Sequence, residues 1–340
     1  MAKVLVTGAA GFIGGYLVRQ LLADGHDVVG VDDYSKYGPV RRAHDDHPRY
    51  RLVRADARDA DVLSAQLEGC DHLVACAALV GGIGYFHARP YDLLAANERI
   101  AASTCDAAIA AHRDGTLAKV TYLSSSMVYE SADRWPSAEG DERTIAPPAS
   151  SYGFSKLAVE YFARAAWQQY GLPYTIVRPF NCVGTGEMPV AAPAAAQPGN
   201  RALAMSHVVP DLVRRVLLGQ DPLHILGDGS QVRHYTYGGD IARGIALAMT
   251  SDRALNEDFN LSTAVPTTVL ELAGLIWSRI RGAEPLRVCS DEPFEHDVRM
   301  RSPEVSKARE VLGFEATVTL PEMLDEVIDW VAAGLAAGTL

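Results

Sequence analysis

Cysteine is scarce in this chain of 340 residues, and no two cysteines are spaced as a CxxC motif. Such spacing argues against a disulfide framework and against a structural zinc site, so we expect no bound metal. Unpaired cysteines fit a reducing compartment, and we expect the protein in the cytoplasm. The five are Cys70, Cys76, Cys105, Cys182 and Cys289.

Long apolar runs and excess positive charge are also lacking. No run of 18 or more apolar residues predicts a membrane span, and the N-terminal MAKVLVTG has neither the charged nor the long apolar region of a signal peptide. The 31 Lys and Arg stand against 42 Asp and Glu, which gives a formal net charge of -11. A nucleic acid is therefore not an expected partner, whereas a few local arginines can still hold a small anion.

Short apolar runs alternate with helical patterns through the first half of the chain. Strands that read as continuous apolar runs between helices predict a doubly wound α/β fold, with a parallel sheet covered on both faces. The strands are expected at residues 3–8, 27–33, 50–56, 72–78, 119–126 and 174–180. The helices are expected at residues 12–25, near 59–68, and at 92–113 and 152–170.

The pattern changes after about residue 180. Residues 184–206 are rich in Ala and Pro without a clear period, which we interpret as a long loop that becomes ordered on binding; a surface linker is the alternative. We expect a first domain over 1–180 and a smaller α/β domain mainly over 181–340, with segments at about 233–262 returning to the first. Within the second domain we expect a helix at 207–219, a strand at 223–226, and helices at about 268–281 and 320–337.

A glycine-rich turn joins the first expected strand to the first helix. TGAAGFIG places Gly8, Gly11 and Gly14 where a tight turn, close approach to a pyrophosphate and close helix packing favour a missing side chain. The helix that follows, beginning with Phe12 and Ile13, offers free N–H groups and a positive dipole potential to that anion. The segment therefore predicts a dinucleotide site.

Two aspartates close the second expected strand. Asp32 follows Gly11 by 21 residues, a position from which a carboxylate accepts hydrogen bonds from the adenosine ribose. Asp33 stands beside it, and no adjacent arginine is present to receive a 2′-phosphate, so we expect NAD rather than NADP. Asp56, after the third strand, is expected at the adenine edge; a residue that simply starts the next helix is the competing interpretation.

A phenol and an ammonium stand one helical turn apart in SSYGFSK, residues 150–156. Tyr152 and Lys156 share a helix face because they are four residues apart. A free phenol, with a pKa of about 10, is a poor base at neutral pH, and we expect Lys156 and the positive nicotinamide ring to lower that pKa. LSSSMVYE, residues 123–130, supplies serines at the carboxyl end of a strand, where parallel sheets bind ligands.

These motifs together resemble the extended short-chain dehydrogenase/reductase family. The likeness rests on GxxGxxG, Ser-x-x-x-Tyr, YxxxK and RPFN at 178–181, and it covers the chain except residues 184–206. GDGSQVRHYTYGGDIARGI at 227–245 and SKAREVLGF at 306–314 resemble the nucleotide-sugar epimerase/dehydratase branch. The resemblance implies a Rossmann-type NAD-binding domain, a nucleotide-sugar substrate domain, and a homodimer formed through the helices near 97–112 and 152–170.

The resemblance also implies the catalytic groups. The catalytic hydroxyl maps to Ser125, four residues before Tyr129, and it acts together with Tyr152 and Lys156. Lys156 would also hold the nicotinamide ribose. The neighbouring serines remain alternatives for the hydroxyl, namely Ser124 and Ser126.

Two departures from the resemblance restrict the reaction. Relatives that remove water across C5–C6 of the sugar carry an Asp–Glu pair where this chain has Ser126 and Met127, which argues against a 4,6-dehydratase. Residues 79–86, LVGGIGYF, resemble GDP-sugar epimerase/reductases, but those carry a cysteine at the position of Met127. Inversion at C3 or C5 is therefore disfavoured, and the nucleotide base stays open.

On the substrate side, the resemblance implies that Arg233 and Arg301 contact the diphosphate. Asn181 and His207 match nucleotide-sugar contacts, although a helix cap would also explain His207, and the sequence offers no explanation for His234. The expected substrate residues are Ser126, Met127, Asn181, His207, Val208, Arg233 and Arg301. The expected cofactor residues are Gly8, Gly11, Phe12, Ile13, Gly14, Asp32, Asp33, Asp56, Ala57, Ala77, Ala78, Leu79, Tyr152, Lys156 and Pro179.

The implied activity is NAD-dependent inversion of C4 of a nucleotide sugar through a transient 4-keto sugar. Tyr152 takes the proton of the 4-hydroxyl, with Ser125 bridging. The alternatives are other 4-keto chemistry, namely decarboxylation, 3,5-epimerisation or 4-keto reduction, with 4,6-dehydration the least favoured. A non-catalytic NAD-binding scaffold is a further alternative, but such a protein would be expected to have lost the tyrosine or the lysine.

Overall fold

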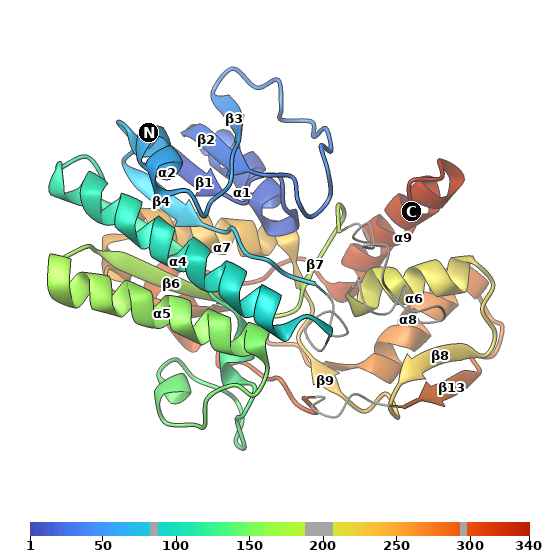
Figure 1. Ribbon diagram of the computed structural model, residues 1–340. Coiled ribbons are helices and arrows are strands. Elements are labelled where there is room, and N and C mark those ends of the chain that lie inside the picture. Colours follow the sequence, from blue (N-terminus) through green and yellow to red (C-terminus); the bar gives the residue numbers. More distant parts are fainter. Residues whose placement is uncertain (82–87, 188–206, 293–297) are drawn as a thin grey trace.

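The structure is a computed structural model that describes residues 1–81, 88–187, 207–292 and 298–340. Seven parallel strands form the central sheet, in the order β11-β6-β5-β4-β1-β2-β3 (Figure 1). The order reverses direction between β1 and β4, which is the point where such sheets open a crevice at the strands' carboxyl ends. The strands are β1 (Lys3–Thr7), β2 (Asp27–Asp32), β3 (Tyr50–Arg54), β4 (His72–Ala75), β5 (Lys119–Leu123), β6 (Tyr174–Pro179) and β11 (Glu257–Leu261).

Helices cover both faces of this sheet. One core cluster joins it to α1 (Phe12–Ala23) and α7 (Gly238–Thr250), and the other joins it to α2 (Ala60–Leu67), α4 (Pro90–Arg113) and α5 (Ser151–Tyr170). Every residue of the inner strands β5 and β6 is buried, as expected for strands covered on both faces of a parallel sheet. The predicted Rossmann-type doubly wound α/β fold is confirmed.

A smaller lobe lies beside the carboxyl edge of the sheet (Figure 1). Its core joins helices α6 (Val208–Leu217), α8 (Val269–Arg281) and α9 (Leu320–Ala336) to a strand of the parallel pair β8 (Leu223–Leu226) and β13 (Val288–Asp291). Helices α8 and α9 each begin with a capping box, which satisfies their first free N–H groups. Two short pairs complete the described strands: β7 (Cys182–Val183) with β10 (Thr236–Tyr237), and β9 (Val232–Arg233) with β12 (Thr267–Thr268).

Two expected features fall largely outside the described residues: most of the segment 79–86 and most of the loop 184–206. The division into domains at about residue 180 stays a prediction. Strand β11 and helix α7 pack with the central sheet, as expected for segments that return to it.

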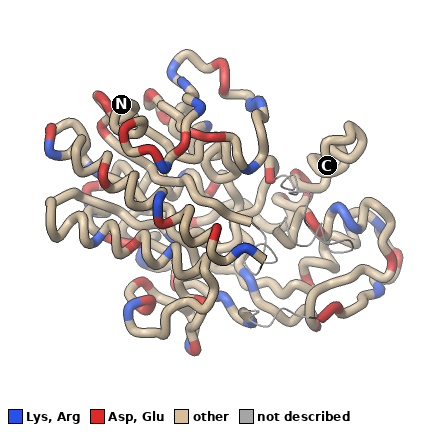
Figure 2. Tube along the Cα trace, viewed as in Figure 1, with Lys and Arg blue, Asp and Glu red and all other residues tan. Residues whose placement is uncertain are grey.

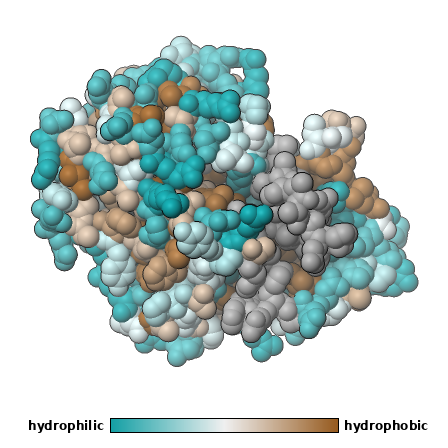
Figure 3. All heavy atoms as spheres, in the orientation of Figure 1, coloured by the Kyte–Doolittle hydropathy of each residue, from teal (hydrophilic) through white to brown (hydrophobic). Residues whose placement is uncertain are grey.

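The surface carries both signs of charge. Figure 2 shows Lys and Arg interspersed with Asp and Glu along the chain. On the face drawn in Figure 3, hydrophobic residues form small patches among hydrophilic ones. Among the described helices, none has the length and apolar character that crossing a membrane requires.

Candidate active site

A cavity of about 580 Å³ follows the carboxyl ends of the central strands into the smaller lobe. Its volume is in the range of small-molecule and cofactor sites. Every residue that the sequence predicts for catalysis, cofactor or substrate lines it. The fold therefore brings the whole predicted set together in one place.

The turn after β1 has the shape of a pyrophosphate cradle. Gly8 has a φ of +69°, and a Cβ there would lie 2.9 Å from the Cα of Ala77. A Cβ on Gly14 would lie 2.0 Å from the carbonyl oxygen of Gly8. Because the backbone passes this close, side chains are excluded and the N-terminus of α1, capped by Gly11, lines the cavity. This geometry fits a dinucleotide, as predicted.

Asp32 is held in place at the end of β2. Its two carboxylate oxygens accept the backbone N–H groups of Ala10 at 3.0 Å and Tyr34 at 2.8 Å. Burial raises the pKa of Asp32, and these two donors partly offset the rise. A carboxylate has about four acceptor positions, so Asp32 can still accept ribose hydroxyls. The arrangement fits the predicted role of Asp32 toward an adenosine ribose.

Two arginines that do not adjoin Asp32 and Asp33 in the sequence, Arg42 and Arg58, lie near them in the folded chain. Arg42 donates Nη2 to the carbonyls of Ala10 and Gly11 at 2.7 and 2.9 Å, so it braces the glycine turn. Arg58 lines the cavity, and its Nε donates to Asp56 at 2.9 Å. The hydrogen bond that Arg58 donates to Asp56 is the main cause that raises the pKa of Arg58, and Asp33 lies close enough to add to the rise. The guanidinium nearest to Asp33 is therefore engaged by Asp56, a contact that the sequence analysis did not anticipate.

The loop after β4 is anchored by a residue that the sequence analysis missed. The Ala77 N–H donates to Thr7 Oγ1 at 3.2 Å, and the Leu79 N–H donates to Asn97 Oδ1 at 2.7 Å. Asn97 Nδ2 donates in turn to the Leu79 carbonyl and to Ser155 Oγ. Asn97 thus ties the loop to α5, the helix that carries Tyr152. The sequence offered no local signal for Asn97, because its burial and its partners depend on how the loop, α4 and α5 meet.

Ser125 and Tyr152 form a hydrogen-bonded pair in the cavity. The Ser125 Oγ also accepts the Met127 N–H at 3.2 Å, which caps a short 3₁₀ helix. Lys156 is buried, and its Nζ donates to the Leu123 carbonyl at 2.8 Å and lies 5.9 Å from the centroid of the Tyr152 ring. The three predicted catalytic residues are therefore neighbours, contributed by α5 and by the segment after β5.

Burial dominates the electrostatics of Tyr152 and Lys156 in the chain without NAD. Burial raises the pKa of Tyr152, and the offsetting groups are Ser125 through its hydrogen bond and Arg301 through its charge. The ammonium of Lys156 donates its hydrogen bond to the Leu123 carbonyl and not to the phenol. Burial lowers the pKa of Lys156 itself to about 8.

The neighbouring serines are used differently. Ser124 Oγ donates to Glu160 Oε1 at 2.7 Å and is buried, so it serves the scaffold and not the phenol. Ser126 and Met127 are buried and line the cavity without offering a carboxylate. Of the three serines, Ser125 is the one that hydrogen-bonds Tyr152.

A buried ion network supports this part of the site. Arg178, fully buried, donates Nε and Nη2 to the two oxygens of Glu160 at 2.7 Å each. Its Nη2 also reaches Asp258 at 2.7 Å, and its Nη1 donates to the Tyr129 hydroxyl at 2.8 Å. Glu160 stands one turn after Lys156 on α5. The network therefore fixes α5 against β6 and β11, and RPFN contributes its arginine to the scaffold.

At the substrate end, Asn181 follows β6 in a left-handed conformation with a φ of +32°. Its Oδ1 is buried and has no hydrogen-bond partner among the described residues, as expected of an atom that accepts a hydrogen bond from a ligand.

His207 occupies the N-cap position of α6 without a side-chain cap bond, and its side chain instead pairs with Glu187. His207 is thus the N-cap residue of α6 by position, but its side chain does not bond the first turn. Glu187 was missed because it stands at the edge of the unpatterned loop.

Arg233 and Arg301 approach the same wall of the cavity from two segments. Both lie close enough to Tyr235 to favour its ionised form, although burial dominates and raises its pKa. The Arg301 N–H donates to the Val232 carbonyl at 3.2 Å, so the backbones of the two segments are paired. Val208 lines the cavity at the start of α6. Two guanidinium groups converging in this way suit a diphosphate.

His234, which the sequence left unexplained, is structural. It is buried, its Nδ1 is 3.0 Å from the Thr263 carbonyl, and it does not line the cavity. Burial lowers its pKa.

Comparisons with known proteins agree with this site. The chain is 30% identical over 336 residues to the UDP-glucose 4-epimerase of Mycolicibacterium smegmatis, covering 96% of this chain and 98% of the relative. It is 28% identical over 334 residues to a dTDP-4-dehydro-6-deoxy-D-allose reductase of a Streptomyces species, covering 96% and 95%.

Solved structures show the same fold with ligands. The UDP-glucose 4-epimerase of Thermotoga maritima, solved with UDP-glucose, superposes with a TM-score of 0.79 at 26% identity over 98% of this chain and 99% of its own. DesIV of Streptomyces venezuelae, a dTDP-glucose 4,6-dehydratase variant solved with NAD, gives 0.83 at 27% identity over 98% of both chains.

The family assignment follows from residues 4–262, which match the model of the NAD dependent epimerase/dehydratase family. That stretch includes the glycine turn, Asp32, and the residues Ser125, Tyr152 and Lys156. The cofactor is NAD, which the family description states and which the cradle after β1 fits. The chain belongs to the NAD dependent epimerase/dehydratase family.

Proposed function

We propose that the chain inverts C4 of a nucleotide-diphosphate sugar through a transient 4-keto sugar. The observation that carries this proposal is the Ser125–Tyr152 hydrogen bond in the cavity that also contains the glycine turn and two arginines. The similarity to UDP-glucose 4-epimerases supports it and makes UDP-sugars the first substrates to test.

The chemistry divides between the cofactor and the chain. NAD, when bound, supplies a hydride acceptor and donor at the sugar carbon. Tyr152 removes the proton of the 4-hydroxyl, directly or through Ser125 Oγ, and returns it after the sugar has turned its other face. Lys156 is placed to hold the nicotinamide ribose. Arg233 and Arg301 hold the diphosphate, so the keto sugar turns without leaving the cavity.

The residues after Ser125 favour this reaction over dehydration. Removal of water across C5–C6 needs an acid and a base beside the sugar, and Ser126 and Met127 offer neither. Glu130 also lines the cavity, but its Oε2 accepts the Ser150 N–H at 2.9 Å. A 4-keto reductase is the second candidate, because the Streptomyces relative of that name aligns with nearly the whole chain.

A substrate panel tests the proposal. The purified chain is incubated with UDP-, dTDP-, GDP- and CDP-sugars, and products are identified by chromatography and NMR while the absorbance of reduced cofactor is followed. Epimerisation yields a C4 epimer with no net cofactor change, whereas a reductase acting on a 4-keto sugar consumes one reduced cofactor per product. Absence of any C4 epimer across the panel would reject the proposal.

Two further proposals concern the state of the protein. We propose a homodimer through α4 and α5, because α5 exposes Phe154, Tyr161 and Trp167 with exposed fractions of 44, 60 and 41%. Light scattering should show a dimer that Tyr161→Glu converts to monomer; a monomeric wild type would contradict the proposed dimer.

We also propose a reducing cytoplasmic location, in keeping with five free cysteines, and fractionation of the source cells tests this location.

A further inference from the structure

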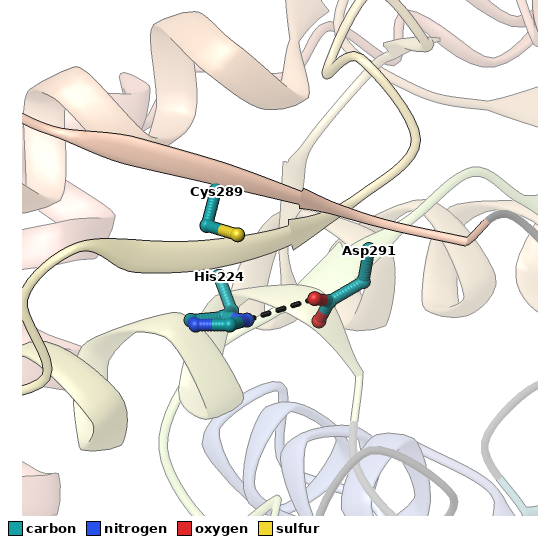
Figure 4. A group of neighbouring side chains, drawn as sticks. All are labelled: His224, Cys289 and Asp291. Carbon is teal, nitrogen blue, oxygen red and sulfur yellow. Dashed lines mark hydrogen bonds and ion pairs between the residues drawn. The ribbon is translucent and has the colours of Figure 1, made fainter.

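Three side chains with metal-binding atoms meet on the two-stranded sheet of the smaller lobe. His224 belongs to β8, and Cys289 and Asp291 belong to β13 (Figure 4). One ligand atom from each lies within 4.8 Å of the other two, and all three residues are half-buried. None of them lines the cofactor and substrate cavity.

The strand register produces this cluster. His224 is paired directly with Cys289 in the parallel ladder, and Asp291 lies two residues further along β13, so all three project from one face of the ribbon. Leu223 and Ile225, which alternate with His224 on β8, are buried in the lobe's core. The cluster is therefore held by backbone pairing and leaves its polar face accessible to solvent.

We propose that His224, Cys289 and Asp291 bind one Zn²⁺ ion, with water as the fourth ligand. Imidazole nitrogen, thiolate sulfur and carboxylate oxygen are the three ligand types of zinc, at distances of about 2.0–2.3 Å. The soft thiolate disfavours Mg²⁺ and Ca²⁺. His224 Nδ1 and Asp291 Oδ1 are already 2.8 Å apart, so small side-chain rotations complete the site. Cys289 binds as the thiolate and releases its proton to solvent.

The bound zinc would cross-link β8 and β13, the two strands that precede the segments carrying Arg233 and Arg301. In the chain, β8 is followed by Arg233 and β13 by Arg301, the two arginines of the cavity wall. These segments pair again beside the cavity, where the Val232 N–H donates to the Arg299 carbonyl at 2.9 Å. Zinc joining β8 to β13 would stabilise the lobe that presents both arginines. This inference is independent of the proposed reaction.

Cobalt and zinc binding to the full chain test the site. After removal of metal with a chelator, Co²⁺ should bind one equivalent per chain and give a thiolate-to-cobalt charge-transfer band in the near ultraviolet. Zn²⁺ should displace it, and a competing chromophoric chelator should give the zinc affinity. We expect Cys289→Ser to abolish the band, and His224→Ala and Asp291→Asn each to weaken zinc binding at least tenfold.

Two variants serve as matched controls. Asp228→Asn removes an exposed carboxylate from the turn after β8, and Cys70→Ala removes a thiol elsewhere; both should keep the band and the zinc affinity. Unchanged NAD binding will show that each variant is folded. Zinc should raise the melting temperature of the wild type and not of Cys289→Ser. A band that persists in Cys289→Ser, or no stoichiometric binding by the wild type, would overturn the site.

Discussion

The cofactor half and the substrate half of the cavity are built in different ways. The cofactor half uses the ends of consecutive strands of one sheet, and its key atoms are backbone groups fixed by Gly8, Gly14 and the carboxylate of Asp32. The substrate half draws Asn181, Arg233 and Arg301 from separate segments, and within the described part of the chain the Asn181 Oδ1 has no hydrogen-bond partner. Binding of NAD therefore depends on backbone groups that the central sheet holds in place. Substrate choice depends instead on side chains that the smaller lobe brings together.

The largest expected effect is a loss of turnover that leaves binding in both halves of the cavity unchanged. Tyr152→Phe should lower turnover by about 10²–10⁴-fold, because only the group that transfers the proton is removed. NAD affinity, measured by titration calorimetry, should stay unchanged. Tyr161→Phe, on the same helix but outside the cavity, removes only a hydroxyl and is the matched control that should keep full activity. Normal turnover by Tyr152→Phe would place the catalytic base elsewhere.

The pH dependence sharpens this prediction. Burial raises the pKa of Tyr152, so without NAD its phenol should ionise above the ordinary range. The base form is lost as the pH falls, and turnover should therefore fall toward low pH. Positive charge of the bound nicotinamide favours the phenolate, so NAD should move the ionisation downward. Ultraviolet difference titrations of wild type against Tyr152→Phe, with and without NAD, measure the pKa of Tyr152. A pKa that does not change when NAD binds would contradict the expected effect of the nicotinamide charge.

The next effect tests the scaffold that both halves share. Glu160→Gln leaves Arg178 with one carboxylate fewer in a buried network, and breaking such pairs costs about 3–5 kcal/mol of folding free energy. Denaturant unfolding should show a loss toward the lower end of that range, because glutamine keeps one acceptor. Glu310→Gln, on the exposed surface, should have no effect. Equal stability of both variants would remove the network from the scaffold.

A smaller effect should be confined to the substrate half. Arg233→Ala should weaken nucleotide-sugar binding by about 1.5–3 kcal/mol, the usual loss for a charge-assisted hydrogen bond, and leave NAD binding intact. Arg299→Ala, an exposed arginine in the paired segment, is the control. If Arg233→Ala binds the nucleotide sugar normally, Arg233 does not hold the diphosphate.

The smallest effect concerns cofactor choice. The wild type should bind NAD more tightly than NADP, because Asp32 and Asp33 repel a 2′-phosphate. Asp56→Asn loosens Arg58, and since half-exposed ion pairs contribute only about 0.2–1 kcal/mol, the preference should fall by no more than about fivefold. The double variant Asp56→Asn/Arg58→Ala should restore the preference for NAD over NADP. Equal binding of both cofactors by the wild type would contradict the role of Asp32.

The difference between the halves also explains what the sequence could predict. Gly8, Asp32, Tyr152 and Lys156 stand in short motifs whose spacing fixes their geometry. Glu187 and Asn97 depend on how distant segments meet, which no local spacing records, whereas Asp56 and Arg58 are only two residues apart and their contact was missed in the local sequence. Burial raises the pKa of Tyr152 in the chain without NAD, and the lowering expected from Lys156 together with the nicotinamide ring stays a prediction for the NAD-bound protein.

The most direct test of the central claim is the fate of deuterium at C4 of an accepted nucleotide sugar. If Tyr152 handles only the hydroxyl proton and the carbon-bound hydrogen leaves and returns within the closed cavity, NMR should show the label retained at C4 of the epimer. Tyr152→Phe should give almost no epimer in the same time. Loss of the deuterium to solvent, or inversion at another carbon, would contradict the mechanism.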